Sequence, residues 1–252
     1  MLSSLTKKLF RRRPTPLATG SSGEDDFDWT TYNAQYAKQL VGIERTQTTK
    51  LAPGDFEWAD NNALALGRGV KPLHPNHHCL YETIAAVGAQ SAIEIGCGGG
   101  DHLHNLQLLF PDLDLWGYDR SEGQLSFLRE RSPHLRDIVQ ARDMTLPHGP
   151  DLRAAEVVYT QAVIMHIHAG NGHLVALSNA CRMAKRAVVL MENWHRHNSV
   201  DDRKMLQAQG MLDWPEMHFS IRRWEDKPHI LLASPTPLPF ETIETIEPLR
   251  HH

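Results

Sequence analysis

The fold is decided by residues 91–100, which read Ser91-Ala-Ile-Glu-Ile-Gly-Cys-Gly-Gly-Gly100. The apolar start of this stretch predicts a buried parallel strand. The glycines at 96, 98 and 100 allow a sharp turn and a close approach of the backbone to a ligand, because no Cβ stands in the way. Apolar residues at 103, 106, 109 and 110 then predict a helix. Strand, glycine loop and helix form half of a nucleotide-binding βαβ unit, with an ordinary tight βα turn as the alternative.

Acidic residues follow the next two predicted strands. The strand at 112–118 ends at Asp119, where an acid about 20 residues past the glycines can accept both hydroxyls of a ribose. The strand at 138–141 is followed by Asp143 and Met144, a pair that suits the amine and the ring face of an adenine. Because ligands in open α/β sheets bind at the carboxyl ends of the strands, we expect these side chains to line one site.

The spacing of the glycines separates two classes of cofactor. In the dinucleotide fingerprint G-x-G-x-x-G, counted from Gly96, the third glycine would fall at Asp101. A carboxylate at a helix start would repel a pyrophosphate, whereas a cofactor that carries a sulfonium and an ammonium would not be repelled. An NAD-dependent oxidoreductase is therefore the less favoured alternative.

The pattern Glu94-x-Gly96-x-Gly98-x-Gly100 resembles the first motif of class I S-adenosylmethionine-dependent methyltransferases. The resemblance covers roughly residues 91–195, with weaker agreement to about 235. It implies an α/β, Rossmann-like doubly wound fold with a mostly parallel seven-stranded sheet, an antiparallel C-terminal hairpin and an N-terminal helical extension. It also implies that S-adenosyl-L-methionine is held by Glu94, Gly96, Cys97, Gly98, Gly100, Asp119, Arg120, Asp143, Met144 and Gln161.

We divide the chain into four parts: a basic tail and linker at 1–26, a helical cap at 27–90, the methyltransferase domain at 91–240 and a C-terminal tail at 241–252. Apolar patterning predicts further elements. Helices are expected at 33–40, 76–87, after 172 and near 199–209, strands at 156–160 and 187–191, a hairpin at 218–224 and 229–233, and an edge strand at 242–246.

The amino-acid composition limits the classes of function that this protein can have. The 252 residues fit one domain with additions, and 41% hydrophobic and 22% charged residues are typical of a soluble globule. The net charge of -4 provides no overall basic surface, so no nucleic-acid partner is expected. Three cysteines without metal-ligand spacing indicate a reducing compartment, and we predict a cytoplasmic location. No apolar run approaches the ~20 residues of a membrane span.

The first 23 residues contain no acid, and Leu2, Leu5 and Leu9 have helical spacing beside a basic cluster. A disordered tail is one interpretation. Peripheral contact with a membrane surface and an organelle transit peptide are the two alternatives.

Three residues are candidates for a catalytic base, since an oxygen nucleophile usually needs one near the operating pH. His166 lies in the segment Met165-His166-Ile167 after the fourth strand of the domain. Many small-molecule methyltransferases carry a similar element there, usually with an acid where this chain has Met165. His195 and Glu192 follow the fifth strand. Packing beneath the cofactor, helix capping and a solvated loop are the structural alternatives.

The run His74-Pro-Asn-His-His-Cys79 contains metal-ligating residue types, but no second cluster with matching spacing follows it. We therefore predict no metal site and interpret these histidines as the start of a helix.

The sequence thus predicts transfer of a methyl group to a small-molecule or saccharide-like acceptor, most simply O-methylation by direct displacement. A catalytically lapsed cofactor-binding scaffold is the alternative from another class. Substitution of valine for Gly96 or Gly98 is expected to abolish cofactor binding and leave the fold intact.

Overall fold

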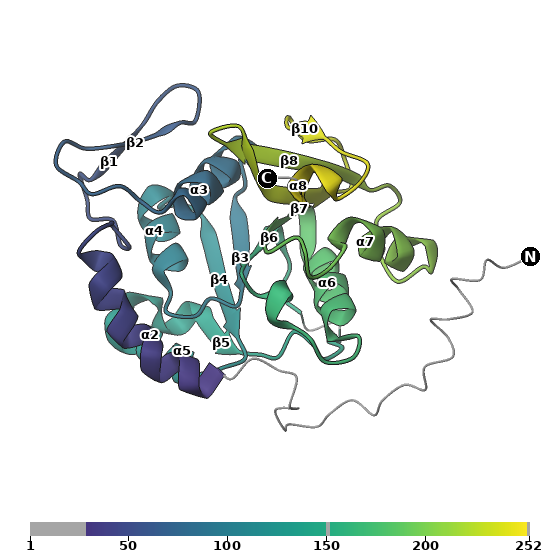
Figure 1. The fold of residues 1–252 in the computed structure, drawn as a ribbon, viewed down its shortest axis with the longest axis horizontal. Helices are drawn as coiled ribbons and strands as arrows, with labels where there is room; N and C mark the ends of the chain where they lie inside the picture. The colour runs from purple at the N-terminus through teal and green to yellow at the C-terminus, as the bar shows by residue number, and fades with distance from the viewer. Residues whose placement is uncertain (1–28, 150–151, 251–252) are drawn as a thin grey trace, which may run out of the picture.

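A computed structural model describes residues 29–149 and 152–250 of the chain. Its centre is an eight-stranded sheet of order β10-β8-β9-β7-β6-β3-β4-β5 (Figure 1). Strands β3 to β7 run parallel to their neighbours within that group, and β8, β9 and β10 pair antiparallel. The strands are β3 (Ser91–Ile95), β4 (Asp114–Asp119), β5 (Val139–Ala141), β6 (Ala155–Gln161), β7 (Ala184–Met191), β8 (His218–Trp224), β9 (Lys227–Ser234) and β10 (Glu241–Thr242).

Helices cover both faces of the sheet, as continuous apolar strands require. In β6, Val157 and Tyr159 face the layer of α3 and α4, whereas Val158 between them packs with α6. Leu103 of α4 and Leu128 of α5 share a smaller cluster that extends the first layer. The helices are α3 (Pro75–Val87), α4 (Asp101–Leu109), α5 (Glu122–Arg131), α6 (Gly172–Met183) and α7 (Ser199–Ala208).

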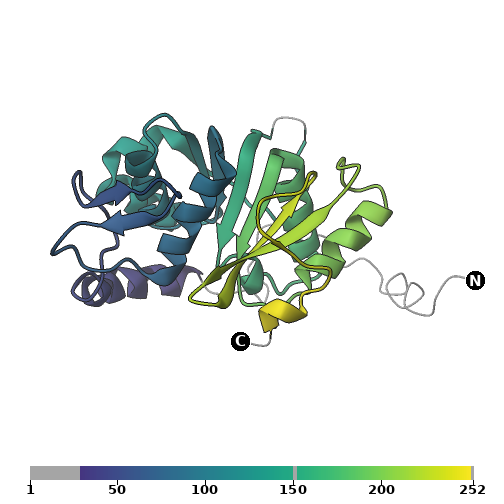
Figure 2. The ribbon, with the colours of Figure 1, turned by 90° about the horizontal axis from the view of Figure 1, so that it is seen from above.

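The N-terminal segment adds α2 (Trp29–Glu44) and a two-stranded sheet of β1 (Phe56–Trp58) and β2 (Leu64–Leu66). Figure 2 shows these elements beside one half of the central sheet, with the C-terminal hairpin at the other half. Helix α2 packs on α5, where the rings of Tyr36 and Phe127 meet edge to face with centroids 6.1 Å apart. The predicted helices of this segment are confirmed, but the small sheet was not expected.

The predicted Rossmann-like fold is confirmed, with an eighth strand at the edge of the sheet. The edge strand predicted at 242–246 is only Glu241–Thr242, because Ile243 and Ile246 turn inward and the chain enters α8 (Glu247–Arg250). The hairpin of β8 and β9 is confirmed. Its turn is the pair Glu225 and Asp226, whose φ angles of 47° and 65° match a two-residue hairpin turn.

Helix α5 was not predicted, because its buried positions are few and its sequence is largely polar. Two 3-10 turns, η1 (Pro133–Ile138) and η2 (Ile164–His166), complete the described elements. Within the described residues, the helices lack the combination of length and apolar character that crossing a membrane requires.

Candidate active site

A cavity of about 560 Å³ lies where β3, β4, β5 and β6 end. This is the edge at which open α/β sheets bind their ligands, and the volume is in the usual range for small-molecule sites. All ten residues predicted to hold the cofactor line the cavity: Glu94, Gly96, Cys97, Gly98, Gly100, Asp119, Arg120, Asp143, Met144 and Gln161. The tertiary structure therefore brings together residues from four strands and the loops that follow them.

Gly98 exposes its backbone to the cavity. Its φ of 49° lies in the left-handed region, and a Cβ built on it would come no nearer than 4.0 Å to a neighbouring side chain, that of Gln124. A ligand can therefore approach the backbone here at close range.

Gly96 and Gly100 serve packing as well. A Cβ on Gly96 would lie 2.2 Å from Cγ2 of Val163, and one on Gly100 would lie 2.7 Å from Cδ1 of Leu128. Both glycines also have a positive φ, of 75° and 78°. The expectation that Gly96→Val leaves the fold intact is therefore wrong, because the new side chain would collide with Val163 before it met any ligand.

Asp119 is fixed by two backbone donors at the end of β4. Its Oδ2 accepts from the N–H of Gly98 at 2.8 Å, and its Oδ1 accepts from the N–H of Ser121 at 2.7 Å. Burial raises the pKa of Asp119, and these two N–H groups oppose the rise. A carboxylate has about four acceptor positions, so two stay available for the hydroxyls of a ribose.

Asp143 and Met144 follow β5 at the same edge. Oδ1 of Asp143 accepts from the N–H of Thr145 at 2.9 Å and from its hydroxyl at 2.7 Å, which forms a tight local turn. The amide of Asn179 donates to the carbonyl of Met144 at 2.9 Å, and Met144 is buried. The carboxylate of Asp143 and the backbone at Met144 are therefore held in place beside the cavity.

The floor of the cavity is a buried polar network. Glu94 is 2% exposed, and its Oε2 accepts from the hydroxyl of Tyr159 at 3.2 Å. Burial raises the pKa of Glu94 well above its ordinary value. Oε1 of Gln161 bonds to Nε2 of His102. Burial also raises the pKa of the Cys97 thiol, which favours its protonated form.

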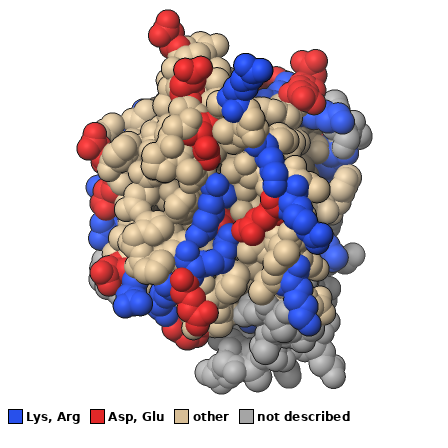
Figure 3. Space-filling model, turned by 90° about the vertical axis from the view of Figure 1, so that its left-hand side faces the viewer, with Lys and Arg blue, Asp and Glu red and all other residues tan. Residues whose placement is uncertain are grey.

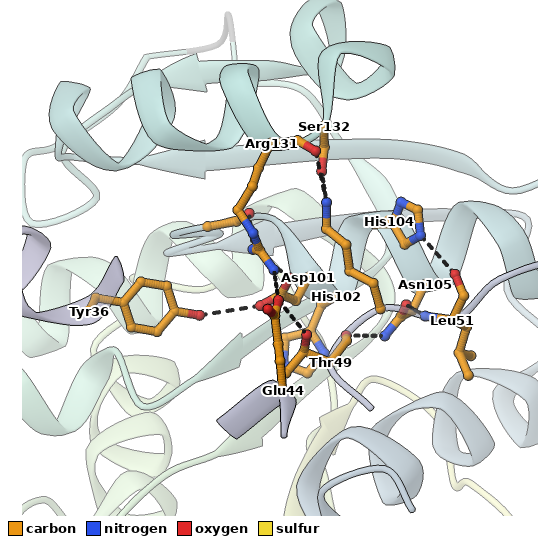
Figure 4. Close-up of polar contacts among 12 residues, drawn as sticks. Tyr36, Glu44, Thr49, Leu51, Asp101, His102, His104, Asn105, Arg131 and Ser132 are labelled. Carbon is orange, nitrogen blue, oxygen red and sulfur yellow. Dashed lines mark hydrogen bonds and ion pairs between the residues drawn. The ribbon is translucent and has the colours of Figure 1, made fainter. Parts of the chain in front are cut away.

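Helix α2 is fastened to the glycine loop through Asp101 (Figure 4). The hydroxyl of Tyr36 donates to Oδ2 of Asp101 at 3.2 Å, and Nη1 of Arg131 donates to Oδ1 at 2.7 Å. Nη2 of Arg131 reaches Oε1 of Glu44 at the end of α2, at 3.1 Å. These contacts hold α2 beside the cavity, which Tyr32 and Tyr36 also line. Arg131 lies in a helix that the sequence patterns did not reveal.

Of the three candidate bases, only His166 lines the cavity. Burial lowers its pKa, and the nearby His168 and Arg196 lower it further. His195 is exposed on the segment after β7 and lies outside the lining residues, which corrects its prediction as a base.

The placement of Glu192 corrects the third candidate. Its carboxylate accepts from the hydroxyl of Thr160 at 2.6 Å and from the N–H groups of Val163 and Met165, each at 3.0 Å. Burial raises the pKa of Glu192. With both oxygens committed to the turn that carries His166, Glu192 positions the η2 segment.

The histidines at the start of α3 have the structural role expected of them. Nδ1 of His74 accepts from the N–H of Asn76 at 3.1 Å and caps the helix, and Nε2 of His78 bonds to the carbonyl of Leu64 at 2.8 Å. In the described part of the chain, no group of three or more His, Cys, Asp or Glu side chains could hold a metal ion. His77 and His102 also line the cavity; sequence analysis interpreted His77 only as part of a helix start and did not single out His102.

Residues 93–191 match the model of a methyltransferase domain family. A comparison with curated protein sequences found no match. Among solved structures, the chain is similar to a TehB-like S-adenosylmethionine-dependent methyltransferase from Corynebacterium glutamicum, with 14% identity, 85% of this chain and 100% of that chain covered, and a TM-score of 0.54.

A second solved structure is CalS10, an amino pentose methyltransferase from Micromonospora echinaspora, with 13% identity, 85% and 100% coverage and a TM-score of 0.53. A third is DesVI of Streptomyces venezuelae, with 22% identity, 44% of this chain and 46% of that chain covered, and a TM-score of 0.38. The chain thus spans the whole of the first two proteins and about half of the third.

The matched residues run from within β3 to the end of β7 and include the glycine loop, Asp119 and Asp143, and the first two solved structures share the fold. This combination favours S-adenosylmethionine over NAD as the ligand of the cavity. Residues 93–191 therefore form a methyltransferase domain, and the fold that contains them is that of S-adenosylmethionine-dependent methyltransferases.

Proposed function

We propose that this protein transfers a methyl group to a hydroxyl oxygen of a small-molecule acceptor. The observation that carries the proposal is that His166 lines the same cavity as all ten residues assigned to the cofactor. A histidine suits the removal of a proton from a hydroxyl at neutral pH. The amino pentose methyltransferase CalS10, which shares the fold, supports an acceptor of saccharide size.

The residues present fit the cofactor. The open backbone of Gly98 and the carboxylate of Asp119 would hold the ribose side, and Asp143 and Met144 would hold the adenine. When bound, S-adenosylmethionine supplies a methyl group on a sulfonium leaving group, so the protein contributes orientation and the exclusion of water.

His166 would act on the acceptor. As the acceptor oxygen forms its bond to the methyl carbon, the carbon–sulfur bond breaks and the sulfur keeps the electron pair. A ring nitrogen of His166 takes the hydroxyl proton. Because burial lowers the pKa of His166, the ring is neutral and able to accept this proton at neutral pH.

The test is a turnover assay with methyl-labelled S-adenosylmethionine and a panel of hydroxylated and amine acceptors of saccharide size. Mass spectrometry and NMR would locate the label. An oxygen-methylated product that His166→Ala fails to form is expected. Methylation of nitrogen or carbon instead would overturn the proposal, and so would undiminished turnover by the variant.

A further inference from the structure

The part of the cavity beside β6 differs chemically from the part beside β4 and β5. Strand β6 lies on the opposite side of β3 from β4 and β5. The aspartates assigned to ribose and adenine follow β4 and β5, and the segment after β6 carries Val163 and His166. The start of α3 joins this second part, because the ring of His77 lies 4.3 Å from that of His102, which bonds to Gln161 at the end of β6. We call this part the acceptor chamber.

The acceptor chamber contains no available carboxylate among the described residues. Glu94 is buried against Tyr159, and Asp101 is paired with Arg131 and bonded by Tyr36. The two arginines that line the cavity, Arg120 and Arg142, follow β4 and β5 on the other side of β3. Neither an ammonium nor a carboxylate on the acceptor would therefore find a partner of opposite charge in the chamber.

The histidines of the chamber are uncharged at neutral pH. Burial lowers the pKa of His74, His77 and His166, and it lowers the pKa of His102 to about 4. A charged acceptor would lose its hydration here without compensation, which is costly in a buried site.

His102 is a fixed wall of the chamber. Its Nε2 bonds to Oε1 of Gln161 and therefore carries the proton, and its Nδ1 lies 3.2 Å from the hydroxyl of Tyr81. Asn105 donates to the oxygen of Tyr81 at 2.8 Å, so the tyrosine proton is directed to His102. Asn105 also bonds to the backbone of Thr49 and Leu51, as Figure 4 shows. Both nitrogens of His102 are thus used within the protein.

His77 is different. Its Nδ1 is buried without a hydrogen-bond partner among the described residues, and the residue lines the cavity. A buried N–H without an acceptor is rarer and more costly than a bare lone pair, so the proton belongs on Nε2. With the proton on Nε2, His77 has an N–H donor at a residue that lines the cavity.

We propose that the acceptor is an uncharged compound that bears hydroxyl oxygens, and that Nε2 of His77 donates a hydrogen bond to one of these oxygens. This inference rests on the proposed function. To that function the inference adds the charge of the acceptor and a residue that determines specificity, His77.

The test compares three fluorescent probes with the same ring. These are 2-naphthol, which is neutral at pH 7, 2-naphthoic acid, an anion, and 2-(aminomethyl)naphthalene, a cation. Each is titrated into protein saturated with S-adenosylhomocysteine, whose own affinity is measured first. We expect 2-naphthol to bind about tenfold more tightly than either charged probe, which corresponds to about 1.4 kcal/mol.

Variants of His77 test the donor. His77→Leu should weaken 2-naphthol binding by about tenfold, and His77→Gln, which keeps an N–H donor, should weaken it by less than about threefold. His134→Leu, an exposed position outside the cavity, is the matched control.

Tighter binding of 2-naphthoic acid or 2-(aminomethyl)naphthalene than of 2-naphthol would overturn the inference. An unchanged affinity of His77→Leu for 2-naphthol would also overturn it, and so would a failure of all three probes to bind. If the unchanged protein does not bind S-adenosylhomocysteine at all, that result counts against the proposed function instead. If His77→Leu itself loses cofactor affinity, His77→Gln and the ranking of the three probes decide.

Discussion

Nη1 of Arg131 donates to Oδ1 of Asp101 over 2.7 Å, which joins the end of α5 to the first residue of the helix after the glycine loop. The second nitrogen of the same guanidinium reaches Glu44 at the end of α2. One arginine therefore ties together the cofactor loop and the helix beside it. Both partners of the main pair are shielded, with side chains 16% and 9% exposed.

Removal of this arginine should destabilise the fold. Arg131→Met leaves the Asp101 carboxylate buried without its cation, at a cost on the order of 2–4 kcal/mol in the free energy of unfolding. Urea denaturation measures the change. The control is Arg129→Met, whose pair with the exposed Glu122 should contribute less than about 1 kcal/mol.

The loss in Arg131→Met should depend on pH. Burial already raises the pKa of Asp101 and Arg131 opposes the rise, so the pKa rises further without the arginine. A carboxyl whose folded pKa is raised loses stability as the pH increases through that pKa. The deficit of the variant should therefore be full at pH 7 and smaller at about pH 5. A deficit that grows on acidification would contradict this account.

Substitution of Asp119 should weaken cofactor binding. If Asp119 binds the ribose as proposed, Asp119→Ala removes two charge-assisted hydrogen bonds and should cost about 2–4 kcal/mol in calorimetric affinity for S-adenosylmethionine. The exposed Asp112→Ala serves as the control. Equal affinities of Asp119→Ala and the unchanged protein would remove Asp119 from the cofactor site.

The two cofactor-loop glycines should respond differently. Gly98→Ala points a methyl group into the open cavity, so cofactor affinity should fall more than stability. Gly96→Ala should lower the free energy of unfolding by about 1–3 kcal/mol, because its Cβ meets Val163. Adding Val163→Ala should restore part of that loss. Thermal unfolding and calorimetry of the three variants separate the effects, and equal losses of stability at both glycines would refute the distinction.

Titration of the catalytic base should affect the pH dependence of the rate of single-turnover methyl transfer. The rate should fall on acidification as His166 is protonated, at a pH below its ordinary pKa of 6.5, because burial lowers that pKa. This limb should vanish in His166→Ala and persist in His195→Ala, whose side chain is exposed. A limb that survives in His166→Ala assigns the proton transfer elsewhere.

The basic N-terminal segment lies outside the described residues, and its role stays a prediction from sequence. A basic stretch contributes roughly 1 kcal/mol per nearby cation to binding of anionic bilayers, and salt weakens the effect. Deletion of residues 1–25 should leave cofactor affinity unchanged and reduce sedimentation with anionic vesicles. If both forms sediment alike at low salt, the segment is an ordinary tail.

Local sequence patterns were sufficient to predict most elements of the fold. Strand β3, the glycine loop and α4 follow from a short apolar run, alternate glycines and helical spacing, all of which act between near neighbours. The position of Asp119 and Asp143 at strand ends follows as well, because parallel strands of one sheet end at one edge. Helix α5 was not predicted, because its apolar stripe is narrow and its burial comes mainly from contact with η1, β4 and β5.

The amino-acid sequence by itself predicted the fold class, the cofactor and ten residues that line the cavity, because these depend on strand order and on residue type at strand ends. Only the tertiary structure decided among the bases: it placed His166 in the cavity, committed Glu192 to the η2 turn and left His195 exposed. It also made Gly96 a packing residue through Val163 and brought His77 to His102. These outcomes depend on distances between residues far apart in the chain, which no local pattern contains.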